Sequence, residues 1–171
     1  MDVTFSNFLG RGLILPGDRL YDPMEGLWIK RENDERLAVG MTEPTVLMGG
    51  TVREIEALVE DGRHVEPGDT VLLALTGKLK YLGAPVAGTL IYSADLASLP
   101  QKIGENPYEA TLFHIVPDKA ENPNLLDASG YATALKDSDG ARNPGGHKGG
   151  ASPTCKAVYA GLGEQTIKEN T

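Results

Sequence analysis

Short runs of hydrophobic residues, separated by turn residues, dominate the middle of this chain. The run Thr70–Thr76 is apolar enough for a buried strand, and two further runs follow after sharp turns. The pattern therefore predicts a strand–turn–strand–turn–strand segment over Val65–Ile91. Its predicted strands are Thr70–Thr76, Leu79–Leu82 and Thr89–Ser93.

The first turn of this segment contains Gly77 and Lys78. A two-residue loop with glycine first is typical of a type II′ turn, which needs a positive φ at that glycine. This turn places Lys78 at the tip of a hairpin, where a lysine could carry a prosthetic group. Lys80, on the returning strand, is interpreted as a surface lysine.

Outside this segment the pattern predicts a second hairpin and short helices. Leu27–Met41 reads as two strands joined by a polar turn. Thr42 and Pro44 are typical of a helix start, and the glycines that follow limit that helix to a few residues. Hydrophobic residues at helical spacing over Leu125–Leu135 predict an amphipathic C-terminal helix. Further predictions are strands at Val52–Leu58 and Thr111–Val116, a Pro-Gly-Asp turn at 67–69, and a single helical turn at Asp95–Leu99 before Pro100.

The two ends of the chain differ from this middle part. Residues 1–17 contain hydrophobic side chains without a clear period, and we interpret them as an arm packed on its own domain or docked on another subunit. From Asp137 the chain is rich in Gly, Pro and polar residues, which is typical of a linker. The sequence therefore predicts an arm over 1–17, one domain over 18–136, and a linker and tail over 137–171.

The composition supports a β-rich domain and excludes several classes of partner. The 171 residues include 21 Gly and 11 Pro, which favours an all-β or loop-rich design. The net charge of −8 argues against nucleic acid and anionic membranes, and favours basic protein partners. No hydrophobic run is long enough for a membrane span and no secretory signal is recognisable, so a cytoplasmic location is expected.

Residues that could carry catalysis or bind a metal show no recognisable arrangement. The single cysteine, Cys155, excludes an internal disulfide and a cysteine-cluster metal site. His64, His114 and His147 lack metal-ligand spacing, and no Ser/His/Asp order or phosphate loop is present in the sequence. We therefore expect no metal site and no enzymatic activity.

Five stretches, in this order along the chain, carry a likeness to a known family. They are DRLYDPMEGLWIKRENDERLAVGMTE, VEPGDTVLLA, GAPVAGTLI, ENPYEATLFHI and NPNLLDASGYATAL. The chain from Asp18 to Lys136 thus resembles the H-protein family of the glycine cleavage system, a relative of the lipoyl and biotinyl carrier domains. The resemblance implies a mainly β fold, a flattened β-barrel or sandwich of the barrel-sandwich hybrid type, with short helices and a C-terminal helix.

The resemblance also implies a function as a carrier. In this family a lysine at a hairpin tip holds a lipoyl group in amide linkage. The group takes an aminomethyl unit from a pyridoxal-phosphate decarboxylase to a tetrahydrofolate-dependent transferase, and a reductase then reoxidises it. The protein presents the cofactor and is not itself an enzyme. Lys78 is the candidate attachment residue.

The sequence departs from the family pattern at this lysine. In lipoyl and biotinyl domains the modified lysine lies eight residues before the proline of the following turn, and counting back from Pro85 reaches Gly77. The family also has an acidic residue three positions before the lysine. Counted from Gly77 this position holds Ala74, and counted from Lys78 it holds Leu75. The Met-Lys-Met of biotinyl domains is absent, which makes biotin the less suitable cargo.

Two hypotheses remain open. The first is a lipoyl carrier with its cofactor on Lys78, serving glycine cleavage or a related pathway. The second is an unmodified structural or docking subunit of a larger complex, such as a carboxylase or oxidoreductase. In both, residues 1–17 and 137–171 are candidate contacts with partner proteins.

Overall fold

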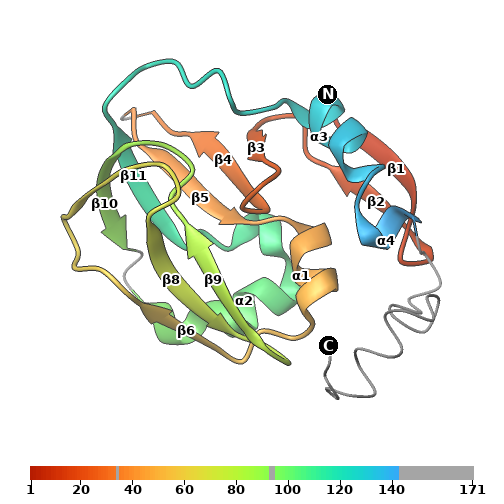
Figure 1. Ribbon diagram of the computed structural model, residues 1–171, viewed down its shortest axis with the longest axis horizontal. Helices are drawn as coiled ribbons and strands as arrows, with labels where there is room; N and C mark the ends of the chain where they lie inside the picture. The colour runs from red at the N-terminus through yellow and green to blue at the C-terminus, as the bar shows by residue number, and fades with distance from the viewer. Residues whose placement is uncertain (34, 93–94, 143–171) are drawn as a thin grey trace, which may run out of the picture. The chain divides into compact units, whose positions relative to one another are not determined.

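The computed structural model describes residues 1–33, 35–92 and 95–142, and consists mainly of antiparallel strands (Figure 1). The strands are β1 Val3–Phe8, β2 Arg11–Leu15, β3 Leu20–Asp22, β4 Leu27–Arg31, β5 Leu37–Met41, β6 Glu54–Ala57, β7 His64–Val65, β8 Thr70–Leu75, β9 Leu79–Gly83, β10 Gly88–Tyr92 and β11 Phe113–Pro117. The α-helices are α1 Glu43–Gly49, α2 Leu99–Glu105, α3 Ala128–Leu135 and α4 Asp139–Arg142, and the 3-10 helices are η1 Leu96–Ser98 and η2 Pro107–Glu109. Among the described residues, no helix has the length and hydrophobicity needed to cross a membrane.

The chain divides into two compact units. The first contains Met1–Thr4 and Ile14–Ala134, and the second contains, among the described residues, Phe5–Leu13 and residues 135–142. The second unit therefore combines two segments that lie far apart in the sequence. The domain boundaries expected at residues 17 and 136 stay predictions.

The first unit contains two antiparallel sheets that share one core. One sheet has the strand order β3-β4-β5-β11-β10-β7, and the other has the order β6-β8-β9. Residues of both sheets, among them Val39 and Ile115 from the first and Leu72 and Leu82 from the second, belong to the same buried cluster. Two sheets that bury their inner faces against each other form a sandwich, so the predicted fold class is confirmed.

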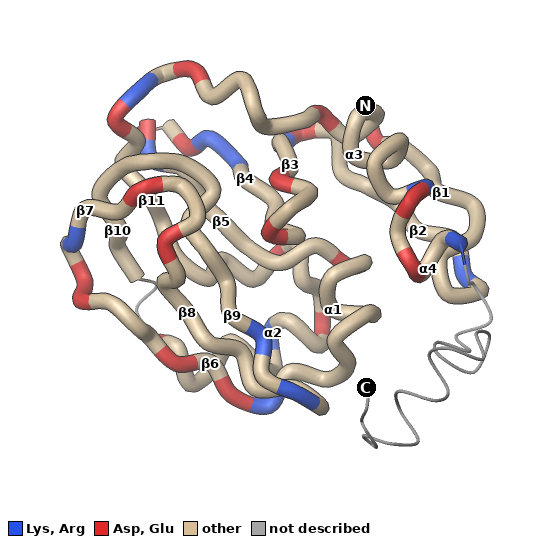
Figure 2. The backbone as a smooth tube through the Cα atoms, viewed as in Figure 1, with Lys and Arg blue, Asp and Glu red and all other residues tan. Residues whose placement is uncertain are grey.

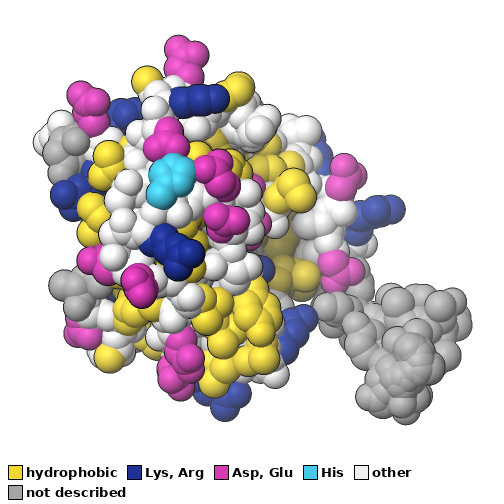
Figure 3. Space-filling view, turned by 60° about the vertical axis from the view of Figure 1, so that its left-hand side comes forward, with side chains coloured by type: hydrophobic (Ala, Val, Ile, Leu, Met, Phe, Trp, Pro, Cys, Tyr) yellow, Lys and Arg dark blue, Asp and Glu magenta, His cyan; other side chains and the backbone are white. Residues whose placement is uncertain are grey.

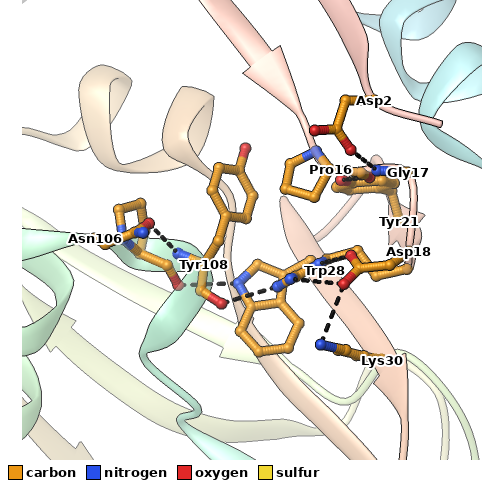
Figure 4. A network of polar contacts seen from close by, with 11 residues as sticks. Asp2, Pro16, Gly17, Asp18, Tyr21, Trp28, Lys30, Asn106 and Tyr108 are labelled. Atoms are coloured by element: carbon orange, nitrogen blue, oxygen red, sulfur yellow. Dashed lines mark hydrogen bonds and ion pairs between the residues drawn. The ribbon is translucent and has the colours of Figure 1, made fainter.

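The predicted hairpin Leu27–Met41 is present as β4 and β5, with Leu27 paired with Met41. Trp28 faces Gly40 across this pair and is buried. Its indole N–H donates to the carbonyl of Pro107 at 3.0 Å (Figure 4). This bond satisfies the one polar group of a large buried ring, and it ties the hairpin to η2.

Arg19 lies beside this ring and completes a polar network. Its guanidinium is 4.7 Å from the centre of the Trp28 ring and donates to the carbonyl of Tyr108 at 2.9 Å. It also bonds Asp18, and that hydrogen bond, helped by Lys30, lowers the pKa of the Asp18 carboxyl to about 2. A buried cation is thus paired with a carboxylate and stacked on an aromatic ring, as its burial requires.

The predicted helix after Met41 is confirmed in its start and its end. The Thr42 side chain accepts a hydrogen bond from the amide of Thr45, and Pro44 lies in the first turn. Gly50 ends α1 with a φ of 89°, a value that favours glycine. The turn at 67–69 is confirmed in the same way, because Gly68 has a φ of 89°.

The helix near Pro100 is longer than expected. The prediction was a single turn that stops at the proline, whereas η1 is followed directly by α2. Pro100 lies in the first turn of α2, where its missing N–H costs nothing because that N–H has no partner within a helix. The proline therefore begins this helix rather than ending the preceding one.

The N-terminal residues form a hairpin, where the sequence predicted no regular element. β1 and β2 pair with each other, and Leu9 and Gly10 at the turn have φ values of 52° and 83°. Positive φ at both central residues is typical of the turn that suits a two-residue hairpin. Three consecutive hydrophobic residues concealed the alternation, since Leu13 and Leu15 are buried while Ile14 is exposed.

Within the second unit, the turn end of this hairpin, Phe5–Leu13, contacts α4. The amide of Leu9 donates to the carbonyl of Gly140 at 2.9 Å, and the Phe8 ring packs against Gly140 so closely that a Cβ would clash. Asp139–Arg142 is thus helical, where the sequence predicted a linker. His147 and Cys155, like the rest of 143–171, lie outside the described residues.

Gly40 allows a direct test of this packing. A methyl group at Gly40 would overlap the buried Trp28 ring, so we expect Gly40→Ala to lower the free energy of unfolding by about 1–3 kcal/mol. Denaturant titration measures the change. Gly104→Ala is the matched control: no heavy atom lies near its added methyl, and it should leave stability equal or slightly higher. Equal stability of the Gly40→Ala variant and the unmodified protein would contradict the packing described.

Candidate functional site

The loop between β8 and β9 presents Gly77 and Lys78, and it has three residues rather than the predicted two. Leu75 pairs with Leu79, which leaves Thr76, Gly77 and Lys78 outside the ladder. Gly77 is not among the residues with a positive φ. The predicted type II′ turn is therefore wrong.

Thr76 explains why the loop has this form. Its backbone N–H and its hydroxyl both donate to the carbonyl of Lys78, at 2.9 and 2.8 Å. The same hydroxyl oxygen accepts from the amide of Lys78 at 3.2 Å. Such local bonds compete with the strand ladder, so Thr76 leaves the strand and closes the loop. The side chain that does this is buried, with 2% of Thr76 exposed.

A second residue holds the base of the loop from outside the hairpin. Arg53, just before β6, donates from its guanidinium to the carbonyl of Thr76 at 3.0 Å. Its backbone amide donates to the carbonyl of Leu75 at 2.7 Å. The backbone on the β8 side of the loop is therefore held by two bonds from a neighbouring segment. Neither Thr76 nor Arg53 was identified from the sequence, because the bonds that Thr76 makes to Lys78 and that Arg53 makes to Thr76 form only in the folded chain.

The two lysines of the hairpin lie in different surroundings. Lys78 is exposed at the end of the loop, whereas Lys80 is half-buried and pairs with Ala74. Figure 2 shows basic residues near the end of the β8–β9 hairpin and acidic residues along β6. Lys78 thus has the exposure that an attached arm requires, and Lys80, interpreted as a surface lysine, is partly covered.

The facing of β8 also locates the position where the resemblance expects an acidic residue. Ala74 points into the core and is fully buried, whereas Leu75 points outward and is half-buried. A carboxylate at position 74 would be buried without a partner, at a cost of several kcal/mol. Position 75 could accept one, and it lies three residues before Lys78.

The loop residues fit a lipoyl group in amide linkage. Such a linkage needs an amine that an enzyme can reach and a backbone that holds it outward. Lys78 supplies the exposed amine, and the bonds between Thr76 and Lys78 fix the backbone.

A separate polar cluster surrounds His64 on β7. Its Nε2 lies 2.7 Å from an Asp118 oxygen and its Nδ1 lies 3.5 Å from a Glu66 oxygen. The three exposed side chains bring donor atoms within 4.8 Å of one another, an arrangement that could hold a cation. No sequence motif indicated this cluster, because Asp118 lies 54 positions from His64.

Two antiparallel sheets over one core form the sandwich that a domain of the lipoyl-carrier type is expected to have. A comparison with models of protein families matches residues 19–138 to the family described as "Glycine cleavage H-protein". The chain belongs to the glycine cleavage H-protein family. Proteins of this family are lipoyl carriers rather than catalysts and act with partner enzymes of the glycine cleavage system, so the prediction of a non-enzymatic protein is confirmed.

Individual relatives agree with this assignment. The chain is 36% identical to a probable glycine cleavage system H protein of Pyrococcus furiosus, over 68% of this chain and 90% of the relative. It is 35% identical to the glycine cleavage system H protein of Azoarcus sp., over 72% of this chain and 98% of the relative. This chain also matches the crystal structure of a glycine cleavage system H protein from Mycobacterium marinum, with a TM-score of 0.60 and 29% sequence identity. The match covers 70% of this chain and 97% of the solved one. These relatives give the docking-subunit alternative no support.

Replacement of Thr76 tests how the loop is held. Thr76→Val removes both hydroxyl bonds to Lys78, so we expect about 1 kcal/mol lower stability and faster hydrogen exchange at the Lys78 amide. Gly77→Ala is the control, because its methyl group meets no heavy atom within 4 Å and its φ is not in the left-handed region. If Gly77→Ala lowered the free energy of unfolding and Thr76→Val did not, the loop would instead be a type II′ turn that depends on Gly77.

The His64 cluster predicts a dependence on pH. The hydrogen bond to Asp118 raises the pKa of His64 above its ordinary value. Protonated His64 is thus favoured in the folded state, so its contribution to stability is present below the unfolded pKa of about 6.5 and lost as the pH rises through the folded pKa. An NMR titration should show a higher pKa for His64 than in the Asp118→Asn variant. Equal values would contradict the pairing.

Proposed function

We propose that this protein carries a lipoyl group on Lys78 and presents it to the enzymes of glycine cleavage. The observation that carries the proposal is the exposure of Lys78 on a loop whose backbone is held by Thr76. A carrier needs a mobile arm on a fixed base, because the arm must reach several active sites while its attachment point stays with the domain. The loop supplies such a base.

The facing of the strands supports Lys78 over Gly77 as the family's lysine position. Counted back from Lys78, the position for an acidic residue is the outward-facing Leu75. Counted back from Gly77, it is Ala74, which faces the core. Only the first count places both the lysine and its upstream neighbour on the surface, so the one-residue displacement is absorbed within the loop.

When bound, the lipoyl group supplies a redox-active pair of sulfur atoms that accepts and releases the aminomethyl unit. The chain's own residues do the rest. Lys78 provides the amide nitrogen, and Thr76 and Arg53 hold the loop backbone so that the arm starts from one place. Residues 1–17 and 137–171 stay candidate contacts with the partner enzymes.

A test of attachment compares the two lysines of the hairpin. The purified protein is incubated with lipoic acid, ATP and a lipoate–protein ligase, and its intact mass is measured. We expect the unmodified chain and Lys80→Arg to gain one lipoyl group, and Lys78→Arg to gain none. The proposal would be contradicted if Lys78→Arg gained a full lipoyl group, or if the chain without substitutions gained none.

A further inference from the structure

The outer face of the sheet β6-β8-β9 is unusually apolar beside the loop. The pairing places Leu73 of β8 opposite Tyr81 of β9, and Leu75 opposite Leu79. Residues two apart on a strand share a face, and so do directly paired residues on neighbouring strands. These four side chains therefore form one apolar surface, which we call the hairpin face.

The hairpin face is open to solvent. Leu79 is 56% exposed and Tyr81 57% exposed, while Leu73 and Leu75 are half-buried. Figure 3 shows hydrophobic side chains gathered on this side of the molecule, with charged side chains around them. A grouped set of exposed hydrophobic side chains, unlike scattered single ones, marks a surface that contacts another molecule.

Acidic residues border the hairpin face on one side. Glu54 pairs with Leu75 and Glu56 pairs with Leu73, and both glutamates are exposed. Across the three strands, Glu54 lies in line with Leu75 and Leu79, and Glu56 lies in line with Leu73 and Tyr81. The chain as a whole is also acidic, with a net charge of −8. A partner that covers this surface should therefore have an apolar centre and a basic rim.

The position of Lys78 limits which partner this is. Leu79 follows Lys78 directly, and Tyr81 lies two residues further along a strand that rises about 3.3 Å per residue. An enzyme that forms a bond to the lysine amine must bring that amine into its active site, so its surface has to cover residues this close. An enzyme that acts on the far end of an attached arm has no such need.

We propose that the hairpin face is the docking surface for the enzyme that attaches the lipoyl group to Lys78, and that this enzyme meets it with an apolar, basic-rimmed surface. The inference rests on the proposed function. In the attachment step, the neutral amine of Lys78 attacks the carbonyl carbon of an activated lipoyl donor, such as an acyl adenylate. The C–N amide bond forms, the C–O bond to the phosphate breaks, AMP leaves, and the proton of the amine passes to solvent.

The test measures the rate of attachment rather than the activity of the loaded carrier. Initial rates of lipoyl transfer by a lipoate–protein ligase are followed by intact mass for the unmodified chain, Tyr81→Ser and Leu79→Ser. Because both side chains are exposed, folding should survive, and thermal unfolding checks this. We expect kcat/KM to fall by about tenfold, since truncating a large side chain at the centre of an interface has this effect. Val116→Ser is the matched control, because Val116 is 45% exposed on β11 of the other sheet, and its rate should stay unchanged.

Two further measurements separate the outcomes. Direct binding of the ligase to Lys78→Arg, which cannot react, should weaken to the same degree on adding Tyr81→Ser. Glu54→Gln with Glu56→Gln should slow attachment at low salt and have less effect at high salt.

The failure of the inference differs from the failure of the proposed function. If the chain without substitutions gains no lipoyl group, the proposed function is contradicted. If the chain without substitutions gains a lipoyl group, and Tyr81→Ser and Leu79→Ser gain it at the same rate, the docking surface alone is overturned. A dimer that Tyr81→Ser converts to a monomer, with attachment unchanged, would also overturn it by assigning the face to a second copy of the chain.

Discussion

The burial of Leu82 in the shared core is the constraint on which the candidate site depends. Side chains alternate along a strand, so once Leu82 faces inward, Tyr81 and Leu79 are set toward solvent. The pairing of Leu75 with Leu79 then fixes where the ladder ends and how many residues remain for the loop. The exposure of Lys78 and the composition of the hairpin face are thus consequences of one core position.

The loop shows how a lysine displaced by one residue can stay exposed. A shift of one residue within a strand would exchange the two faces, at the cost of burying charge and exposing the core. Here the shift is taken up outside the ladder, where Thr76 leaves the strand and bonds Lys78 on both its amide and its carbonyl. The strands keep their register, and the lysine remains at the tip.

Local patterns predicted much of the fold, and the misses have physical reasons. Alternation and turn residues were sufficient for the β4–β5 hairpin, the Thr42 cap and the turn at Gly68. They failed for β2, where the exposed Ile14 is hydrophobic and so hides the alternation of apolar and polar residues. They also failed for Pro100, because a proline can either end a preceding helix or lie in the first turn of a following one. For the site, the sequence predicted an exposed lysine but not its loop, because Gly-Lys suggested a glycine turn while the deciding interaction belongs to Thr76. The His64 cluster needed the folded chain, since Asp118 reaches it from a distant segment.

Peptide mapping of the protein purified from the cells that produce it determines whether Lys78 carries a lipoyl group. Trypsin does not cleave after a lysine whose amine is acylated, so a lipoyl group on Lys78 gives the peptide His64–Lys80 with one lipoyl group attached. This peptide is the predicted result. A bare peptide His64–Lys78 in every preparation, or a lipoyl group on Lys80 instead, would contradict the account.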